Sequence, residues 1–334
     1  MQRKLAVGLA LTGMLSVTGG TSIVRAAEPT PLVIDSDMIS DDWMATLFVL
    51  NDPDYAVKAI TVSGTGFATC EAGVKSALGL LALEEYGDVP VACGAETPSM
   101  GTNGPPDEWM TTAESVAALG LPEGGEAAKD DAVKLFTSTV RDSPEPITVL
   151  ALGPLTNLAA AFEATPDLVN NIEMIYVMGG AVDVPGSAVS DENATAEWNI
   201  FSDPHAARIV FESGAPITLV PLDATNEAPV TPAFVEKLEA APKTPAAEFV
   251  AKLLENNAES IESGSYYFWD PLAAVVMAHP ELVTTTERQV TVVDIPGDPN
   301  DGRTKPVGNG STIMVVTEPN SEALEDALIA AWTQ

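Results

Sequence analysis

Residues 31–44 read PLVIDSDMISDDWM, an apolar run that leads directly into four closely spaced carboxylates. The run from Pro31 to Asp35 is typical of a strand that is buried on both faces. From Asp41 the apolar spacing becomes that of a helix, which we expect to continue to Leu50. A strand followed at once by a helix is the unit of a parallel sheet, and such sheets bind ligands beyond the carboxyl ends of their strands. The carboxylates therefore lie where a ligand site is expected.

The same alternation of strand and helix continues along most of the chain. Further strands are predicted at residues 57–62, 89–92, 147–151, 174–178 and 217–222, with helices at 72–86, 130–141, 155–163 and 204–213. Residues 295–306 are expected to link two late strands, 289–294 and 312–316, before a last helix at 321–332. Residues 181–195 are long for a connection and predict a flap. The sequence thus predicts an α/β fold with an open, mostly parallel central sheet and helices on both faces, similar to a Rossmann fold.

The charge balance limits the partners. The chain has 334 residues, and 48 acidic residues against 15 Lys and Arg give a formal net charge of −33. Nucleic acids and anionic membrane surfaces are bound by clustered basic side chains, so this balance argues against both. Hydrophobic residues make up 46% of the chain, as in a globular protein and unlike a disordered one. We therefore expect a folded protein with a small-molecule ligand, most of whose acids are solvated surface.

The N-terminal residues have the pattern of an export signal. Arg3 and Lys4 precede an apolar run, Leu5 to Val17, and the small residue Ala26 follows at a suitable distance for cleavage. This pattern predicts a signal peptide at 1–26 and one α/β domain at 27–334, exported to the periplasm or secreted. An uncleaved anchor is the alternative, although the run is short for a bilayer. No later stretch is long enough to cross a membrane, so no membrane association is expected after cleavage.

Two cysteines, Cys70 and Cys93, are the whole thiol content of the chain. In an exported protein they predict either one disulfide or two small buried apolar side chains. The spacing alone does not decide between these, because it does not show whether the Cα atoms come within reach.

The acidic cluster after the first strand predicts a cation site. A helix start accounts for one or two carboxylates through capping and the helix dipole, but the others repel one another unless a cation or protons intervene. Carboxylates without a neighbouring His or Cys favour Ca²⁺ or Mg²⁺ over Zn²⁺. An EF-hand is excluded because Ser40 and Thr46 stand where its Gly and Glu are required. A phosphatase of the haloacid dehalogenase type stays a minor alternative, since it lacks a convincing lysine motif downstream.

The cluster resembles the signature Asp-x-Asp-x-Gly-x-Asp-Asp of the inosine-uridine preferring nucleoside hydrolases. Asp35, Asp37, Asp41 and Asp42 match its acidic positions, whereas Ile39 departs at the Gly. Further blocks resemble the family in the expected order over most of the chain: AITV at 59–62, ALGPLTN at 151–157, YVMGG at 176–180, AEWN at 196–199, VPLDAT at 220–225 and WDPLA at 269–273. Any one block is weak support, but their order together is strong.

The resemblance implies a role for each matching residue. Asp37, Asp42 and Asp270, with the backbone carbonyl of Thr156, would ligate Ca²⁺, and Asp37 would also be the general base that takes a proton from the attacking water. The remaining implied contacts are Asp41 and Asn199 to ribose hydroxyls, Glu197 toward the 5′-hydroxyl, and Asp35 as the residue that orients the loop. This agrees with the chemistry, because hydrolysis of an N-glycosidic bond develops positive charge on the sugar, which nearby carboxylates stabilise.

Two departures from the family concern the leaving base. Many members have a His before the last metal-ligating Asp, and here that residue is Trp269; Thr65 stands where the family has an Asn. The chain's two histidines, His205 and His279, are predicted to begin and to end helices as structural or surface residues.

Aromatic side chains offer another way to activate the leaving base. Trp269 and Trp109 would stack on either face of a nucleobase and ease its protonation, as the resemblance implies for purine-preferring members; Trp198 and Tyr267 are further aromatic candidates. The alternative is that both indoles belong to the core.

The sequence therefore predicts a Ca²⁺-dependent enzyme that hydrolyses ribonucleosides to ribose and free base; the two indoles favour a purine base, but the sequence leaves the base preference open. A non-catalytic or repurposed protein that binds a ribosyl ligand in a calcium-dependent manner is the alternative, because His is absent at position 269 and Asn at position 65. The resemblance also implies a homodimer or a homotetramer, without indicating the contact surface.

Overall fold

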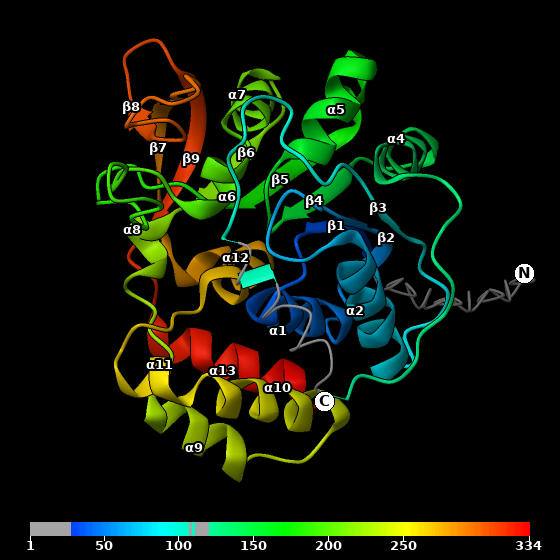
Figure 1. Cartoon of the computed structure of the whole chain (residues 1–334). Helices are drawn as coiled ribbons and strands as arrows, with labels where there is room; N and C mark the ends of the chain where they lie inside the picture. The colour runs from blue at the N-terminus through cyan, green and yellow to red at the C-terminus, as the bar shows by residue number, and fades with distance from the viewer. Residues whose placement is uncertain (1–27, 107–108, 111–119) are drawn as a thin grey trace, which may run out of the picture.

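Nine strands of the described residues form one sheet, in the order β3-β2-β1-β4-β5-β6-β9-β7-β8 (Figure 1). The computed structural model describes residues 28–106, 109–110 and 120–334, so the predicted signal peptide lies outside the described residues. The strands are β1 (Thr30–Ser36), β2 (Tyr55–Val62), β3 (Val91–Cys93), β4 (Ile147–Ala151), β5 (Ile172–Met178), β6 (Ile217–Val220), β7 (Thr284–Val292), β8 (Thr304–Pro306) and β9 (Ser311–Thr317).

The sheet is mostly parallel, as predicted. All pairs from β3 across to β9 are parallel, and only β7 runs antiparallel to its neighbours β9 and β8. The strand order reverses beside β1, which has β2 on one side and β4 on the other. Connections leave the sheet in opposite directions at such a point, and a crevice opens at the carboxyl ends of the two strands. The acidic cluster follows β1, and the segment 152–156 follows β4.

Helices cover both faces of the sheet because successive strand residues point to opposite sides. Leu32 and Ile34 belong to one apolar core, whereas Val33 belongs to the other. The first core is covered by α1 (Ser40–Leu50), α2 (Cys70–Leu83), α9 (Pro232–Ala240), α10 (Pro245–Asn256), α12 (Trp269–Ala278) and α13 (Ser321–Trp332). The second is covered by α4 (Ala132–Asp142), α5 (Thr156–Ala164) and α7 (Pro204–Glu212), which Figure 1 shows on the other side of the sheet.

Several short helices connect these elements. They are α6 (Trp198–Ser202), α8 (Leu222–Thr225), α11 (Ala258–Glu262) and the 3₁₀ segments η1 (Pro166–Asn171) and η2 (Pro280–Leu282). The longer helices start at side-chain caps that the sequence provides. The N-cap residues Asp203, Thr231 and Thr244 each accept a backbone N–H from the first turn, and each is followed by a Pro at the first helical position.

The late part of the sheet differs from the sequence prediction. The strand expected at 289–294 begins earlier, at Thr284, and the expected link 295–306 contains a further strand, β8. Residues 284–287 are exposed and polar, because an antiparallel strand with one solvated face lacks the continuous apolar run used to recognise the buried strands. The strand expected at 217–222 ends at Val220, and Leu222 already belongs to α8.

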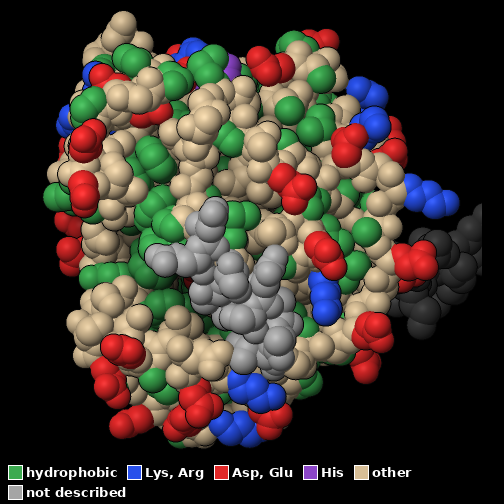
Figure 2. Space-filling view, in the orientation of Figure 1, with side chains coloured by type: hydrophobic (Ala, Val, Ile, Leu, Met, Phe, Trp, Pro, Cys, Tyr) green, Lys and Arg blue, Asp and Glu red, His purple; other side chains and the backbone are tan. Residues whose placement is uncertain are grey.

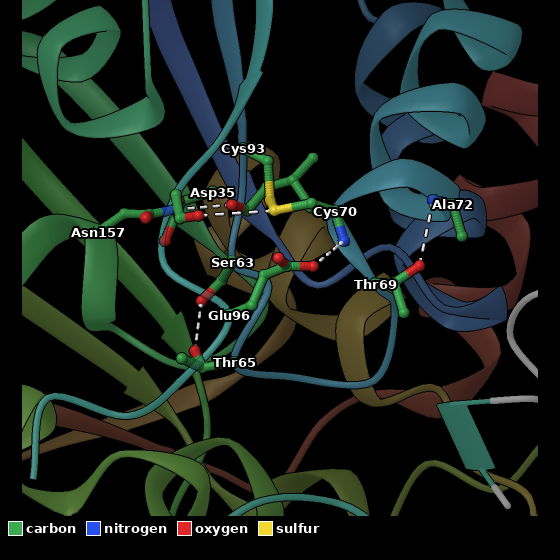
Figure 3. Close-up of a disulfide and its surroundings, with 11 residues drawn as sticks. Asp35, Ser63, Thr65, Thr69, Cys70, Ala72, Cys93, Glu96 and Asn157 are labelled. Carbon is green, nitrogen blue, oxygen red and sulfur yellow. Dashed lines mark hydrogen bonds between the residues drawn. A yellow bond between two sulfur atoms is a disulfide. The ribbon is translucent and has the colours of Figure 1, made fainter. Parts of the chain in front are cut away.

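The disulfide alternative for the two cysteines is confirmed. Cys70 and Cys93 are bonded, with their Cα atoms 5.5 Å apart. The bridge joins the first residue of α2 to the last residue of β3, and Glu96 accepts a hydrogen bond from the backbone N–H of Cys70 beside it (Figure 3). It thereby ties the β2–α2 connection to the edge of the sheet.

The surface carries the acidity that the composition predicts. Figure 2 shows Asp and Glu side chains scattered over one face of the molecule, with few Lys and Arg between them. Among the described residues, none of the helices combines the length and the apolar character that crossing a bilayer requires.

Candidate active site

A cavity of about 640 Å³ brings most of the predicted site residues together. Its walls come from the β1–α1 connection, from α6 and the segment before it, and from the start of α12. The predicted residues that line it are Asp37, Asp41, Asp42, Trp109, Glu197, Trp198, Asn199, Tyr267, Trp269 and Asp270. Thr156 is not among the described residues that line the cavity.

Three carboxylates meet where two helices begin. Asp41 and Asp42 lie in the first turn of α1, and Asp270 lies in the first turn of α12. One oxygen from each of the three side chains lies within 4.8 Å of the others. The positive ends of both helix dipoles favour negative charge at this point, but they do not remove the repulsion among three acids.

Asp42 is held by the turn between β1 and α1. Its Oδ1 accepts hydrogen bonds from the hydroxyl of Ser36 and from the backbone N–H of Met38 (3.2 Å), and its Oδ2 accepts the N–H of Ile39 (3.2 Å). The turn passes through Met38 at φ 54°, in the left-handed region that a non-glycine residue adopts only when its surroundings hold it there. The position of the family's Gly is Ile39, whose φ of −95° is open to any residue, so the missing Gly does not explain the strain at Met38.

Asp37 is held by the connection that follows β2. Its Oδ2 accepts the backbone N–H of Phe67 at 2.9 Å, and its carbonyl accepts the N–H of Ala68 at 3.1 Å. Two glycines make room for it: a Cβ at Gly66 would lie 2.1 Å from Oδ2, and a Cβ at Gly153 would lie 2.8 Å from the backbone nitrogen of Asp37. The side chain is therefore fixed by close backbone contact on two sides.

Burial raises the pKa of every acid in the cluster, and the charge of Asp42 adds to the rise for the other three. Burial is the larger cause for Asp37 and Asp270, and the charge of Asp42 adds to it, so that both pKa values lie well above the ordinary range. Burial likewise raises the pKa of Asp42 and, with the charge of Asp42, raises the pKa of Asp41 to about 8. Acids that are this hard to ionise together repel one another when charged, and a bound cation would offset that repulsion.

The donor set fits Ca²⁺. All candidate ligands are carboxylate oxygens, they are buried and close together, and no His or Cys is among the cavity-lining residues that are described. Hard oxygen ligands of this kind suit Ca²⁺ and Mg²⁺, and flexible oxygen geometry suits Ca²⁺. Asp41, Asp42 and Asp270 are the described carboxylates that lie close enough to hold an ion together, whereas Asp37, which the resemblance implies as a ligand in place of Asp41, lines the same cavity.

Thr156 is buried at the first position of α5. Its hydroxyl donates to Oδ2 of Asp203 at 2.9 Å and lies 2.9 Å from the hydroxyl of Thr65, which in turn lies 3.0 Å from that of Ser63. Thr65, which stands where the family has an Asn, is therefore part of a row of hydroxyl groups that runs from Ser63 to Thr156. The role of the Thr156 carbonyl as a metal ligand stays a prediction.

Glu197 caps α6 from the cavity wall. Its Oε1 accepts the N–H of Asn199 (2.8 Å), and its Oε2 accepts the N–H groups of Gly180 (2.8 Å) and Ile200 (3.2 Å). Burial raises the pKa of Glu197, and these N–H donors partly offset that rise. The carboxylate is thus locked in place before any ligand arrives.

Asn199 is oriented by the ends of two strands. Its Nδ2 donates to the carbonyls of Leu152, just after β4, and of Met178, at the end of β5, at 3.0 and 3.2 Å. Because both amide hydrogens are engaged, the side chain offers a ligand only its Oδ1 acceptor. This suits a hydroxyl group, which can donate to it.

One aromatic group stands at the side of the cavity formed by the β2–α2 connection and α6. The ring of Trp109 stacks on Phe67 with centroids 5.4 Å apart and an interplanar angle of 12°, and it meets the edge of Trp198 at 4.9 Å. Trp109 is 37% exposed, so it is not a core residue. Phe67, which the sequence analysis did not select, holds both the Asp37 carboxylate and this indole.

A second aromatic group surrounds Trp269. Its ring lies 5.4 Å from that of Tyr266 and 5.7 Å from that of Tyr267, and all three residues line the cavity. Trp269 is half-buried at the edge of the core. Each indole thus has its own aromatic neighbours, and the stacking of both on one base stays a prediction.

Asp35 is buried and is not among the described residues that line the cavity. It accepts hydrogen bonds from the hydroxyl of Thr61 (2.5 Å) and from Nδ2 of Asn157 (2.8 Å), the latter drawn in Figure 3. Burial raises the pKa of Asp35 to about 7, against the effect of these two donors. Its position at the end of β1 agrees with a role in supporting the loop.

The histidines have the structural positions that the sequence predicts. His205 is the second residue of α7 and its Nδ1 lies 2.7 Å from Oδ2 of Asp294, while His279 ends α12. Neither is among the described residues that line the cavity.

The comparisons with known proteins agree with the site. The family model of the inosine-uridine preferring nucleoside hydrolases matches residues 32–326. The chain belongs to this family. It is therefore a nucleoside ribohydrolase, which hydrolyses the N-glycosyl bond of ribonucleosides.

The relatives of this nucleoside hydrolase differ in their base preference. The pyrimidine-specific ribonucleoside hydrolase RihA of Salmonella gallinarum is 33% identical over 322 residues, covering 89% of this chain and 96% of that protein. The inosine-uridine preferring nucleoside hydrolase from Bacillus anthracis superposes with a TM-score of 0.81 at 25% identity, over 91% of this chain and 99% of that one. The purine-preferring ribonucleoside hydrolase from Gardnerella vaginalis gives 0.77 at 26% identity, over 91% and 98%.

Proposed function

We propose that this nucleoside hydrolase is Ca²⁺-dependent and prefers purine nucleosides, which it cleaves to ribose and free base. The observation that carries the proposal is the buried carboxylate group of Asp41, Asp42 and Asp270, with Asp37 beside it and aromatic rings lining the same cavity. The carboxylates suit a cation and a sugar with developing positive charge, and the rings suit a flat base.

The residues around the cation have distinct tasks in this proposal. Asp37, Asp42, Asp270 and the carbonyl of Thr156 would hold Ca²⁺. When bound, the ion would lower the pKa of a water molecule and orient the sugar hydroxyls. Asp37 takes the proton from the attacking water, and its backbone contacts with Phe67 and the Gly153 segment keep Oδ1 and Oδ2 in one orientation.

The sugar is bound by residues already fixed in the free protein. Asp41 and Oδ1 of Asn199 accept hydrogen bonds from ribose hydroxyls, and Glu197 faces the 5′-hydroxyl. As the bond to the base breaks, the sugar gains positive charge. A Glu197 carboxylate held by three backbone N–H groups stabilises that charge without having to move.

The purine preference rests on the aromatic lining. Trp269 stands where many relatives have a His that protonates the base, so activation needs another source. Stacking of the base on Trp269 or Trp109 favours its protonated form through cation–π attraction. A purine offers a larger stacking face than a pyrimidine. The relatives themselves do not decide the matter, since RihA is named pyrimidine-specific and the Gardnerella vaginalis protein purine-preferring.

Ribose release from a panel of inosine, adenosine, guanosine, uridine and cytidine, with and without a chelator, tests the proposal. We expect the purine nucleosides to have the higher kcat/KM and the chelator to abolish release. A higher kcat/KM for uridine than for inosine would overturn the purine preference, and undiminished hydrolysis after complete calcium removal would overturn the metal role.

The alternative of a calcium-dependent ribosyl-ligand binding protein is favoured by Trp269, which leaves position 269 without an acid, and by Thr65 in place of the family's Asn. Retention of Asp37, Asp42 and Asp270 argues for catalysis, because bare ligand binding does not need a general base. Absence of ribose release from every nucleoside in the panel would support the alternative.

We also propose export, with residues 27–334 as one domain after removal of the signal peptide. The Cys70–Cys93 disulfide supports this, because such bonds persist in oxidising compartments. N-terminal sequencing of the protein from its native host is expected to start near Ala27. A homodimer or homotetramer is likewise proposed from the family resemblance, with sedimentation equilibrium as its test.

A further inference from the structure

Asp301, in the connection between β7 and β8, binds two distant segments as well as the start of its own connection. The side chain is buried, at 3% exposure. Its Oδ1 accepts the backbone N–H of Ile295 at 2.9 Å, and its Oδ2 accepts Nδ2 of Asn103 at 2.9 Å. Its carbonyl accepts Nδ2 of Asn193 at 2.8 Å. Asn103 and Asn193 are distant in sequence from Asp301, and each belongs to a segment that leads to the cavity.

The connection that carries Asp301 is itself fixed to the active-site frame. Gly302, at φ 82°, is pressed against α6: a Cβ there would lie 2.8 Å from Cα of Phe201. The hydroxyl of Thr304 donates to the carbonyl of Ala181 (2.9 Å) and accepts its N–H (2.8 Å). Figure 1 shows this hairpin at the edge of the sheet, beside the segment that contains α6.

Asn193 extends this frame to the sugar site. Its Oδ1 accepts the N–H groups of Thr195 (3.1 Å) and Ala196 (3.2 Å), directly before Glu197. The backbone of Asp301 is therefore joined through one buried amide to the segment that positions the Glu197 carboxylate.

The side chain of Asp301 serves a different segment, the loop that leads to Trp109. Asn103 is bound to Asp301, and Gly101 approaches Pro296 of the same connection, since a Cβ at Gly101 would lie 3.7 Å from it. Two prolines, at 105 and 106, then restrict the backbone, and the N–H of Trp109 donates to the carbonyl of Pro106 at 2.9 Å. The bond to Asp301 therefore restrains the chain at Asn103, shortly before Trp109 in sequence.

We propose that Asp301 is a positioning residue for base recognition: its carboxylate anchors the Trp109 loop to the frame that holds Glu197, and so sets the spacing between the base and sugar ends of the cavity. Asp301 touches no substrate. The inference rests on the proposed placement of the base against Trp109. Its ligand class is the nucleobase, and its effect is on the affinity for nucleosides with large bases.

The pair Asn103 and Asp301 can be transposed, which provides the test. Asn103→Asp places two carboxylates against each other, and like charges at this distance repel strongly. Combining Asn103→Asp with Asp301→Asn restores a donor and an acceptor, because the amide at position 301 can accept from Ile295 with its oxygen and donate to position 103 with its nitrogen. Asp298→Asn is the matched control, since Oδ1 of Asp298 bonds only to Asn300 within the turn among the described contacts.

Two readouts are compared across these variants. The first is hydrogen–deuterium exchange of residues 101–110 without nucleoside, which reports the anchoring whether or not the protein is active. The second is the KM for inosine, or its Kd if no ribose is released, against that for p-nitrophenyl riboside. For Asn103→Asp we expect faster exchange and a KM for inosine raised about tenfold, with kcat little changed. The transposed double variant should recover both, and Asp298→Asn should resemble the wild type.

The outcomes separate the inference from the proposed function. Unchanged exchange in Asn103→Asp, or a double variant that recovers nothing, overturns the anchoring role. Faster exchange with equal changes for inosine and p-nitrophenyl riboside overturns the role in base recognition. The base placement itself is tested by Trp109→Ala: an unchanged inosine affinity there contradicts the proposed function, whatever Asn103→Asp does.

Discussion

The backbone N–H of Phe67 donates a hydrogen bond to Oδ2 of Asp37 over 2.9 Å, so the backbone of a loop helps to hold the proposed general base. That loop ends at Cys70, whose disulfide to Cys93 ties it to the edge of the sheet (Figure 3). Because this donor belongs to the backbone, replacing the side chain of residue 67 would not remove it. The orientation of Asp37 therefore depends on the path of residues 63–70.

The double substitution Cys70→Ser and Cys93→Ser is expected to lower the free energy of unfolding by about 3 kcal/mol, because it releases a loop with a sequence separation of 23 residues in the unfolded chain. Urea unfolding of the calcium-loaded protein measures this. The kcat of the folded fraction should stay near that of the wild type, since the Phe67 N–H remains. Wild type treated with a reductant is the control, and an unchanged unfolding midpoint in both samples would contradict the expectation.

Asp37→Asn is expected to lower kcat for inosine by about 10²- to 10⁴-fold, the usual contribution of a general base. The affinity for inosine should be retained, because Asn keeps the shape and one oxygen of the side chain. Steady-state kinetics and calorimetric titration with inosine measure the two quantities. Asp298→Asn, at a surface turn away from the cavity, controls for the loss of one acidic charge. A kcat within a few-fold of the wild type would exclude Asp37 as the base.

Much of the site could be predicted from sequence because parallel strands end at one edge of the sheet. Asp37, Asp41 and Asp42 follow β1 directly, and the Glu197 and Asp270 blocks stand at the starts of α6 and α12. Each of these residues is placed by the strand or helix next to it in the sequence, and those elements can be recognised from the sequence alone.

What could not be predicted depends on contacts between distant segments. Phe67 had no motif to mark it, and its ring stacks on Trp109, more than forty positions away by number. The bond of Asn103 to Asp301 joins segments 198 positions apart, and Asp301 lies in a stretch whose Pro, Gly and Asp content indicates only a loop. The edge strand β8 was missed for the same reason, since its pairing with β7 and not its composition makes it a strand.

The calcium-free protein is expected to lose stability as the pH rises from 6 to 9. Burial raises the pKa of Asp35 to about 7 and that of Asp41 to about 8, against 3.8 as the ordinary value. The folded state therefore keeps protons that the unfolded state releases. This contribution to stability is complete below about pH 4 and disappears as the pH rises through 7 to 8.

Urea unfolding in chelator at several pH values measures this slope. Calcium should stabilise the protein more at pH 9 than at pH 6, because it takes the place of the lost protons. Asp41→Asn, which removes one of the titrating groups, should give a shallower slope. Stability of the calcium-free protein that rises between pH 6 and 9 would show that these acids are ionised in the folded state.

Trp269→Ala is expected to lower turnover of inosine far more than that of p-nitrophenyl riboside. The p-nitrophenolate leaves without a proton, whereas hypoxanthine has to be protonated, and stacking on the indole favours that protonated base. Loss of a base-stacking ring costs about 1–3 kcal/mol in nucleic-acid complexes, which corresponds to about 5- to 150-fold in rate if the contact is made only in the transition state. Steady-state kcat/KM for both substrates measures the difference.

Trp269→Phe separates stacking from packing in this prediction. Phe keeps an aromatic face beside Tyr266 and Tyr267, so Trp269→Phe should recover part of the inosine activity that Trp269→Ala loses. If the loss came only from the smaller side-chain volume, Trp269→Phe would recover the activity on both substrates equally. The two substrates share the ribosyl group and the carboxylates that hold it, and a disturbed sugar site lowers both rates together. Equal losses for inosine and p-nitrophenyl riboside in Trp269→Ala would therefore assign Trp269 to the support of the sugar site through Asp270, its neighbour in the first turn of α12.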